Sequence, residues 1–189
     1  MLRVDCLRTV YSDIENCLVI TIMGATAAEL QSLGHRPNFF YLQHAMGLAS
    51  STGLGLALSL SDQKIIVFDG DGSLLMNLGS LSTMARYKPK NLVHVVFDNE
   101  SLLSVGGFPT ATGTGTDLEG IARASGIPIV VAVRTVEDFQ NAFRNALNQN
   151  QLTTIVAKVE ATGPVGYVTG LALLENRFQF QRYIQSLKR

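Results

Sequence analysis

Residues 65–73 read IIVFDGDGS, and this stretch decides the fold because it joins an apolar run to a glycine-rich turn around an acid. A second apolar run, residues 92–97, ends in a similar way at Asp98 and Asn99. Short apolar runs of this kind are typical of strands buried on both faces, and a helix-length segment separates the two. The pattern predicts two parallel strands joined by a helical crossover, which places Asp71 and Asn99 at the same edge of a sheet.

The rest of the chain continues this alternation of strands and helices. Strands are expected over residues 18–22, 39–42, 64–69, 92–98, 127–133 and 153–159. Helices are expected over residues 2–14, 25–33, 73–87, 117–124, 136–147 and 177–187. In residues 46–60, glycines lower the helix propensity and indicate close packing of the backbone against a sheet or a ligand. Residues 99–116 are too long for an ordinary connection, and loops of that length are usually functional or disordered. We therefore predict an α/β fold with an open, mostly parallel sheet, helices on both faces, and a single domain over residues 1–189.

Composition narrows the range of partners. The 189 residues include 15 Lys and Arg and 15 Asp and Glu, so the formal net charge is zero, and no basic block occurs. We therefore expect neither a nucleic acid nor an anionic membrane as a partner. No apolar run approaches the roughly 20 residues that cross a bilayer, and no charged-then-apolar leader opens the chain, so we expect a cytoplasmic protein. Cys6 and Cys17 lack metal-binding spacing and are expected to be free thiols, with Cys17 buried.

The two expected strand ends suggest a metal and diphosphate site. Asp71 and Asn99 offer a carboxylate and an amide oxygen, hard ligands suited to Mg²⁺. Glycine in the turn allows backbone N–H groups to approach phosphate oxygens closely. Taken separately, each motif could also be a plain turn or a side-chain cap, but their spacing of 28 residues (99 − 71) suits one βαβ unit that delivers both ligands to one ion.

Two other phosphate-binding patterns fit less well. The Gly-x-Gly-x-x-Gly fingerprint of dinucleotide-binding proteins needs a third glycine, but Leu75 stands at that position after Gly70 and Gly72. The loop that binds nucleoside triphosphates, with its Gly-Lys-Ser/Thr ending, is absent from the sequence.

The motif from residues 70–73 to 98–99 resembles the one by which thiamine-diphosphate enzymes bind Mg²⁺ and the diphosphate of the cofactor. Residues 46–57 and 104–113 extend the similarity to the diphosphate-binding subunit of sulfopyruvate and phosphonopyruvate decarboxylases, over roughly residues 38–135. The resemblance implies the thiamine-diphosphate-binding fold. It also implies that the Asp71 carboxylate, the Asn99 amide oxygen and the Ser101 carbonyl bind Mg²⁺.

The resemblance further implies a set of cofactor contacts. Gly72 and Ser73 would bind diphosphate oxygens, and Met46 would be an apolar wedge that bends the cofactor. The full set implied is His44, Ala45, Met46, Gly70, Asp71, Gly72, Ser73, Asn99, Ser101, Leu102 and Leu103.

Three residues depart from the family pattern. His44 and Ala45 stand where relatives usually have Gly-Ser or Gly-Ala. The His44 carbonyl would still accept from the amino group of the cofactor, while its imidazole is either a catalytic group that faces the substrate or a packed or solvated side chain. Phe108 replaces a frequent Gln, which indicates a more apolar or altered pocket.

The catalytic glutamate of this superfamily comes from a separate pyrimidine-binding domain, and Glu29, Glu100 and Glu119 stand in the wrong contexts for it. The resemblance therefore implies a partner α-type subunit that supplies the glutamate, with self-association also expected. The expected function is the diphosphate-binding subunit of a thiamine-diphosphate and Mg²⁺-dependent decarboxylase of small 2-oxoacids, with a sulfopyruvate-like or phosphonopyruvate-like substrate. The alternatives are a carboligase, a non-catalytic thiamine-diphosphate-binding regulatory subunit, and a generic flavodoxin-like binding module.

Overall fold

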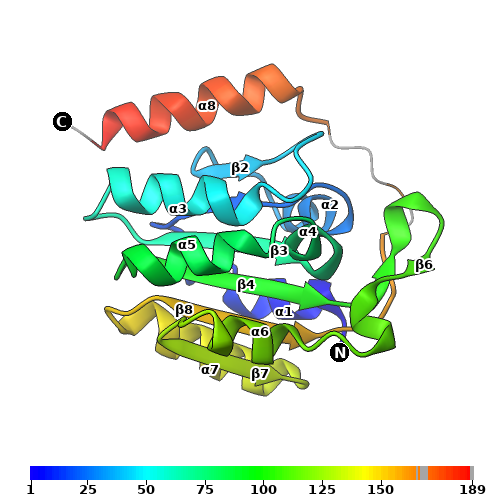
Figure 1. Cartoon of the computed structure of the whole chain (residues 1–189). Coiled ribbons are helices and arrows are strands. Elements are labelled where there is room, and N and C mark those ends of the chain that lie inside the picture. Colours follow the sequence, from blue (N-terminus) through cyan, green and yellow to red (C-terminus); the bar gives the residue numbers. More distant parts are fainter. Residues whose placement is uncertain (165, 167–169, 188–189) are drawn as a thin grey trace.

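The computed structural model describes residues 1–164, 166 and 170–187, and its centre is a six-stranded parallel sheet (Figure 1). The strand order is β2-β1-β3-β4-β8-β7. The strands are β1 (Leu18–Thr21), β2 (Phe39–Tyr41), β3 (Ile65–Gly70), β4 (Leu92–Asp98), β7 (Ile129–Val133) and β8 (Thr153–Lys158). Each expected strand is present within one or two residues of its predicted ends. The chain order reverses beside β1 and β3, a topology that leaves a crevice at the carboxyl ends of these strands.

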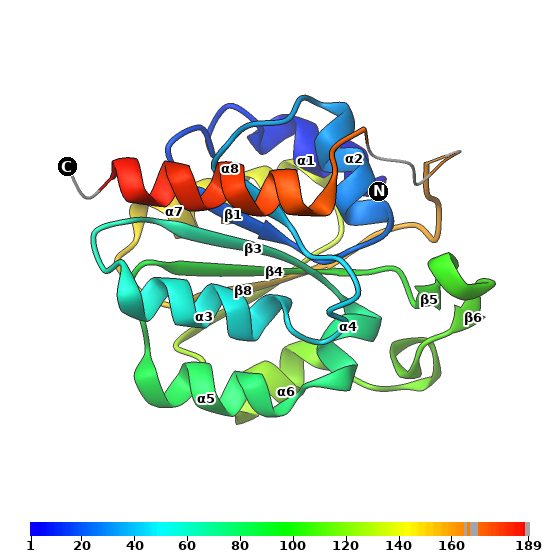
Figure 2. The ribbon, with the colours of Figure 1, turned by 90° about the horizontal axis from the view of Figure 1, so that it is seen from above.

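Helices cover both faces of the sheet, as predicted. Figure 2 shows one layer on each side of the strands. One layer consists of α1 (Arg3–Val10), α2 (Ala25–Ser32) and α7 (Val136–Asn148). The other consists of α3 (Ala49–Ser59), α5 (Gly79–Tyr87) and α6 (Leu118–Ala124). Every residue of β4 is buried, which explains why this strand reads as a continuous apolar run rather than an alternating one.

The prediction of a single helix over residues 73–87 is wrong. The structure divides this segment into two helices, α4 (Asp71–Met76) and α5. Asn77 leaves the helical conformation at φ −147°. Its side-chain amide instead donates to the Gly47 carbonyl at 2.9 Å and to the Ser51 hydroxyl at 3.0 Å. An Asn side chain that bonds to nearby groups competes with helical hydrogen bonds, and here that competition ends the helix.

The segment over residues 99–116 is ordered around a small antiparallel pair, β5 (Ser101–Leu102) and β6 (Phe108–Pro109). Two short 3₁₀ turns, Leu103–Val105 and Ala111–Thr114, complete it. Figures 1 and 2 both place this segment beyond the carboxyl end of β4, near the N-terminus of the chain.

The last helix, α8 (Leu173–Ser186), lies along the edge strand β2 (Figure 1). Buried Asn176 accepts a hydrogen bond from the Tyr41 N–H at 3.0 Å and donates to the Phe39 carbonyl at 2.8 Å. The side chain of one residue thus satisfies backbone groups that an edge strand would otherwise expose. None of the helices in the described part of the chain has the length and apolar character needed to span a membrane.

Candidate functional site

A cavity of about 300 Å³ lies at the carboxyl end of the sheet, where three connections converge. They are the β1–α2 turn, the β3–α4 turn and the β4–β5 turn. Nine of the residues predicted to contact a cofactor line this cavity: Met46, Gly70, Asp71, Gly72, Ser73, Asn99, Ser101, Leu102 and Leu103.

The β3–α4 turn brings backbone to the cavity wall. A Cβ atom added at Gly72 would lie 2.5 Å from Leu102 Cδ2, so no larger residue fits there without movement. The Ser73 hydroxyl oxygen is buried and has no hydrogen-bond partner among the described residues. A buried polar atom without a partner is uncommon, and at a cavity wall it is available to a polar ligand.

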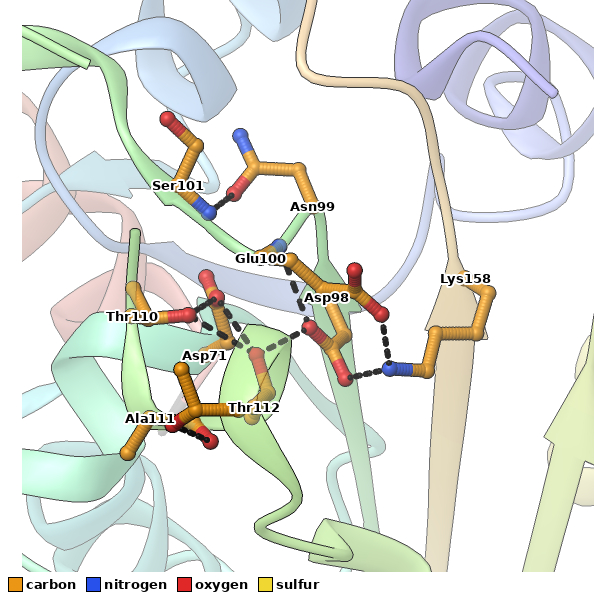
Figure 3. A network of polar contacts seen from close by, with 10 residues as sticks. Asp71, Asp98, Asn99, Glu100, Ser101, Thr110, Ala111, Thr112 and Lys158 are labelled. Carbon is orange, nitrogen blue, oxygen red and sulfur yellow. Dashed lines mark hydrogen bonds and ion pairs between the residues drawn. The ribbon is translucent and has the colours of Figure 1, made fainter. Parts of the chain in front are cut away.

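Asp71 is buried to 4% exposure at the start of α4, and threonine hydroxyls orient its carboxylate. Thr110 Oγ1 donates to Asp71 Oδ2 at 2.6 Å, and Thr112 Oγ1 lies 3.2 Å from the same oxygen (Figure 3). Burial raises the pKa of the Asp71 carboxyl above its ordinary value, partly offset by the Thr110 hydrogen bond and increased by the charge of Asp98. The Thr110 hydroxyl thus holds Oδ2, and no described side chain donates to Oδ1.

A second carboxylate, Asp98, lies at the end of β4, linked to Asp71 through Thr112. Thr112 Oγ1 donates to Asp98 Oδ1 at 2.8 Å, and Lys158 Nζ lies 2.6 Å from Asp98 Oδ2 (Figure 3). Burial alone would lower the pKa of Lys158, but hydrogen bonds and charges from Asp98 and Glu100 together raise it. Lys158 therefore neutralises Asp98 from the side opposite Thr112.

The turn after β4 is tight, and Asn99 is part of it. Asn99 Oδ1 accepts a hydrogen bond from the Ser101 N–H at 3.0 Å, and Asp98 Oδ1 accepts from the Glu100 N–H at 3.2 Å. Glu100 adopts a left-handed conformation with φ +59°. The capping interpretation is thus correct for both side chains. It does not exclude a ligand role for Asn99, because an amide oxygen has a second lone pair.

These groups fit a divalent metal with a diphosphate. The donor set at the cavity combines one carboxylate, one amide oxygen and backbone carbonyls, all hard oxygen ligands. The glycine backbone and the unpartnered Ser73 hydroxyl lie where phosphate oxygens would approach. The described residues contain no cluster of three or more His, Cys, Asp or Glu side chains that could hold a metal by themselves.

His44 and Ala45 are not among the residues that line the cavity. His44 is exposed and has φ +54°, a conformation that glycine adopts more easily. The backbone therefore has the shape expected for a family that usually has glycine at this position. The predicted role of the imidazole stays a prediction.

Sequence reasoning missed one wall of the cavity. Gly24, Ala25 and Thr26 line it from the start of α2, and Arg3 lines it from the start of α1. Gly24 has φ +83° and ψ −139°, which requires glycine, so its position after an expected strand was an available signal. Nothing in the sequence pattern places Arg3 at the carboxyl edge of the sheet.

The fold and site together define an α/β protein with a cavity of hard oxygen ligands and glycine backbone at the carboxyl end of its parallel sheet. The model of the thiamine pyrophosphate enzyme, C-terminal TPP-binding domain family matches residues 21–157. The chain belongs to this family.

Named relatives point to one branch of the family. The chain is 42% identical over 157 residues to the sulfopyruvate decarboxylase subunit beta of Methanocaldococcus jannaschii, covering 82% of each chain. It is 39% identical to the sulfopyruvate decarboxylase of Methanosarcina acetivorans, covering 82% of this chain and 40% of that protein. It is 41% identical to the phosphonopyruvate decarboxylase of Streptomyces hygroscopicus, covering 72% of this chain and 34% of that protein.

Solved structures support the fold. The benzoylformate decarboxylase from Polynucleobacter necessarius superimposes with a TM-score of 0.70 at 18% identity, covering 87% of this chain and 34% of that one. A 4-hydroxybenzoylformate decarboxylase from Rhodococcus jostii gives a TM-score of 0.70 at 22% identity, covering 85% of this chain and 33% of that one. The chain therefore has the fold of about one third of these enzymes.

Proposed function

We propose that this chain is the diphosphate-binding, β-type subunit of a thiamine-diphosphate and Mg²⁺-dependent 2-oxoacid decarboxylase. The observation that carries the proposal is the single cavity that unites the Asp71 carboxylate, the Asn99 side chain and the glycine turn. The likeness to a sulfopyruvate decarboxylase subunit beta over 82% of both chains supports the reaction class. The proposed substrate class is a small 2-oxoacid with an anionic sulfonate or phosphonate end. The names of the relatives, sulfopyruvate decarboxylase and phosphonopyruvate decarboxylase, support this class.

In this proposal the metal is held by Asp71 Oδ1, the Asn99 amide oxygen and the Ser101 carbonyl. Gly70, Gly72 and the Ser73 hydroxyl bind the diphosphate, and Leu102 and Leu103 form an apolar wall beside it. When bound, thiamine diphosphate supplies the electron sink that stabilises the carbanion left as CO₂ departs from a 2-oxoacid.

The side chains of this subunit position the cofactor and exclude water. Thr110 fixes the Asp71 carboxylate, and Met46, which lines the cavity and is 57% exposed, would support the bent form of the bound cofactor. The carbonyls of His44 and Ala45 would lie near the pyrimidine, with the His44 imidazole free to face the substrate.

A partner subunit completes the site in this proposal. The cavity lining has one acidic residue among the described part of the chain, Asp71. The three glutamates closest in sequence to the motifs are engaged elsewhere: Glu29 with Arg3, Glu100 with Lys158, and Glu119 with Arg123. The chain also spans only 34–40% of the two relatives named without a subunit. We infer that a pyrimidine-binding α-type subunit supplies the catalytic glutamate, and that residues 1–189 form one domain that can associate with further copies.

The test is calorimetric titration of the full chain, purified with the subunit it assembles with, using thiamine diphosphate with and without Mg²⁺. Binding should require Mg²⁺. Asp71→Asn should weaken binding by at least about 100-fold, because removal of a hydrogen-bond partner of a metal ligand already costs up to that factor and Asp71 is itself a proposed ligand. Asp62→Asn, which alters an exposed carboxylate in a turn, is the matched control and should bind normally.

Turnover then tests the reaction class. The assembled protein should release CO₂ and an aldehyde from sulfopyruvate or phosphonopyruvate. A coupled product formed with an added aldehyde would instead indicate a carboligase, and tight binding with no turnover would indicate a regulatory subunit. Mg²⁺-independent binding that survives Asp71→Asn would contradict the proposed site itself.

A further inference from the structure

Arg3 is the one lysine, arginine or histidine among the described residues that line the cofactor cavity. Its side chain is 4% exposed, so the charge lies almost entirely out of bulk water. The remaining wall is largely apolar, with Ile22, Phe97 and Met76 among its residues. A guanidinium in such surroundings interacts strongly with any anion that enters.

Glu29 holds this guanidinium from one side. Arg3 Nε lies 2.8 Å from Glu29 Oε2, and Arg3 Nη2 lies 3.0 Å from Glu29 Oε1, a bidentate geometry. Nη2 also approaches the Thr162 carbonyl at 3.4 Å. These contacts use Nε and Nη2, whereas Nη1 has no hydrogen bond to a described residue. The pair therefore orients the guanidinium and leaves part of its fork available.

The pair is costly if its only role is structural. Removing two charges from water usually offsets the gain from their attraction, and apolar replacements of similar volume are often as stable. Glu29 is 7% exposed and lies in α2, whose first residues line the same cavity. Those first residues have no acidic side chain that would repel an anion, and no side-chain cap occupies their N–H groups.

We propose that Arg3 is an oxyanion-binding residue of this cavity, with Glu29 as the counter-ion that sets how strongly the anion is held. The shared chemistry is a phosphoryl or sulfonyl oxyanion, which is either the diphosphate of the cofactor or the anionic end of the substrate. The assignment rests on the proposed function, because that function is what places such an anion in the cavity.

Two substitutions give opposite expectations. Arg3→Gln and Glu29→Gln both break the ion pair and should lower the melting temperature by similar amounts. Arg3→Gln removes the donor and should weaken binding of inorganic pyrophosphate with Mg²⁺ about tenfold. Glu29→Gln removes the competing carboxylate and should tighten it several-fold. A purely structural pair would move both affinities in the same direction, following stability.

The measurement is calorimetric titration of the assembled full chain with Mg²⁺ and inorganic pyrophosphate, beside thermal melts. Arg8→Gln, on the exposed side of the same helix, is the control and should change neither affinity. Arg3→Lys keeps the charge and loses the fork, so it should fall between wild type and Arg3→Gln, and it serves if Arg3→Gln does not fold.

A second arm separates the two sources of the anion. If Arg3 binds the substrate, pyrophosphate affinity stays unchanged, whereas KM for sulfopyruvate rises about tenfold in Arg3→Gln and KM for pyruvate does not. The proposal is overturned if both variants shift pyrophosphate affinity in the same direction and the KM for sulfopyruvate is unchanged in Arg3→Gln. The proposed function is tested separately, because Asp71→Asn must abolish Mg²⁺-dependent pyrophosphate binding whatever Arg3 does.

Discussion

At the scale of single residues, threonine hydroxyl groups orient the buried carboxylate of Asp71. Thr110 and Thr112 have one proton each, and the shortest contacts assign the Thr110 proton to Asp71 and the Thr112 proton to Asp98. These donors stabilise both carboxylates, although the charge of Asp98 still contributes to the raised pKa of Asp71. The segment that supplies these donors reads as loop in the sequence, yet it orients the predicted metal ligand.

Thr110→Val should weaken Mg²⁺-dependent cofactor binding by about tenfold or more, because removal of an outer-shell donor frees the ligand to turn. Thr114→Val is the matched control, since the exposed Thr114 hydroxyl donates only to the Ala111 carbonyl of its own turn. Calorimetric titration of both variants checks the prediction. Equal affinities would mean that Asp71 is oriented by the backbone alone.

Backbone strain at His44 gives a second prediction. A non-glycine residue at φ +54° is held there by its surroundings at a cost of about 1 kcal/mol. His44→Gly should therefore raise the free energy of unfolding by a similar amount, as measured by urea denaturation. If the imidazole also contacts substrate, turnover of the assembled protein falls while stability rises. A variant that is less stable than wild type would show that the imidazole makes packing contacts that outweigh the strain.

At the scale of elements, α3 contains two glycines with opposite surroundings. A Cβ added at Gly53 would lie 2.1 Å from Val67 Cγ2 on β3, whereas one added at Gly55 meets nothing within 4 Å. The prediction of close backbone packing against a sheet or a ligand is confirmed at Gly53, whereas Gly55 packs against no described residue and the prediction stays untested there. Sequence cannot separate them, because the difference depends on which side of the helix faces the sheet.

The two glycines make a matched pair of substitutions. Gly53→Ala should destabilise the protein by about 1–3 kcal/mol, since α3 must move away from the sheet. Gly55→Ala should stabilise it by up to about 1 kcal/mol, because alanine has the higher helix propensity. Urea denaturation of both variants checks the signs. Destabilisation by both would mean that Gly55 is covered by another element or chain.

The limits of the sequence pattern also appear at this scale. The length and composition of the apolar runs predicted the six strands, because each is a short, mostly apolar run that is too short for a helix. They did not predict the break between α4 and α5, because it depends on a hydrogen bond from Asn77 to Gly47, 30 residues away. The N-cap of α7 was predictable, since Thr135 accepts from the Asp138 N–H at 3.0 Å within four residues. Local chemistry is readable from sequence, and contacts between distant segments are not.

At the scale of the whole molecule, one wall of the cavity could be predicted from local sequence patterns and the opposite wall could not. The wall from residues 70–73 and 99–103 could be predicted, because a parallel βαβ unit brings consecutive strand ends together. The opposite wall needs α1 and α2 packed on the other face of the sheet, a placement set by the tertiary core. Arg3 reaches the cavity only because of that packing, so no local sequence motif predicts its position at the cavity.

The core also determines how the whole chain responds to alkaline pH. Burial raises the pKa of the Cys6 thiol to about 12 and that of Cys17 to about 11, from an ordinary value of 9.0. Between pH 9 and these values the unfolded chain loses protons that the folded chain keeps. Stability must therefore fall as pH rises, by up to about 1.4 kcal/mol per pH unit for each thiol, and the contribution is absent below pH 9.

The double variant Cys6→Ala, Cys17→Ala isolates this effect from the other alkaline groups. Both cavities left by alanine lower stability by an amount that does not depend on pH, so the variant should be less stable at pH 7 yet lose less stability between pH 9 and 11. Urea denaturation at pH 7, 9, 10 and 11 measures both slopes. Parallel slopes would mean that the thiols ionise in the folded protein, and that the core around α1 and β1 opens to solvent without global unfolding.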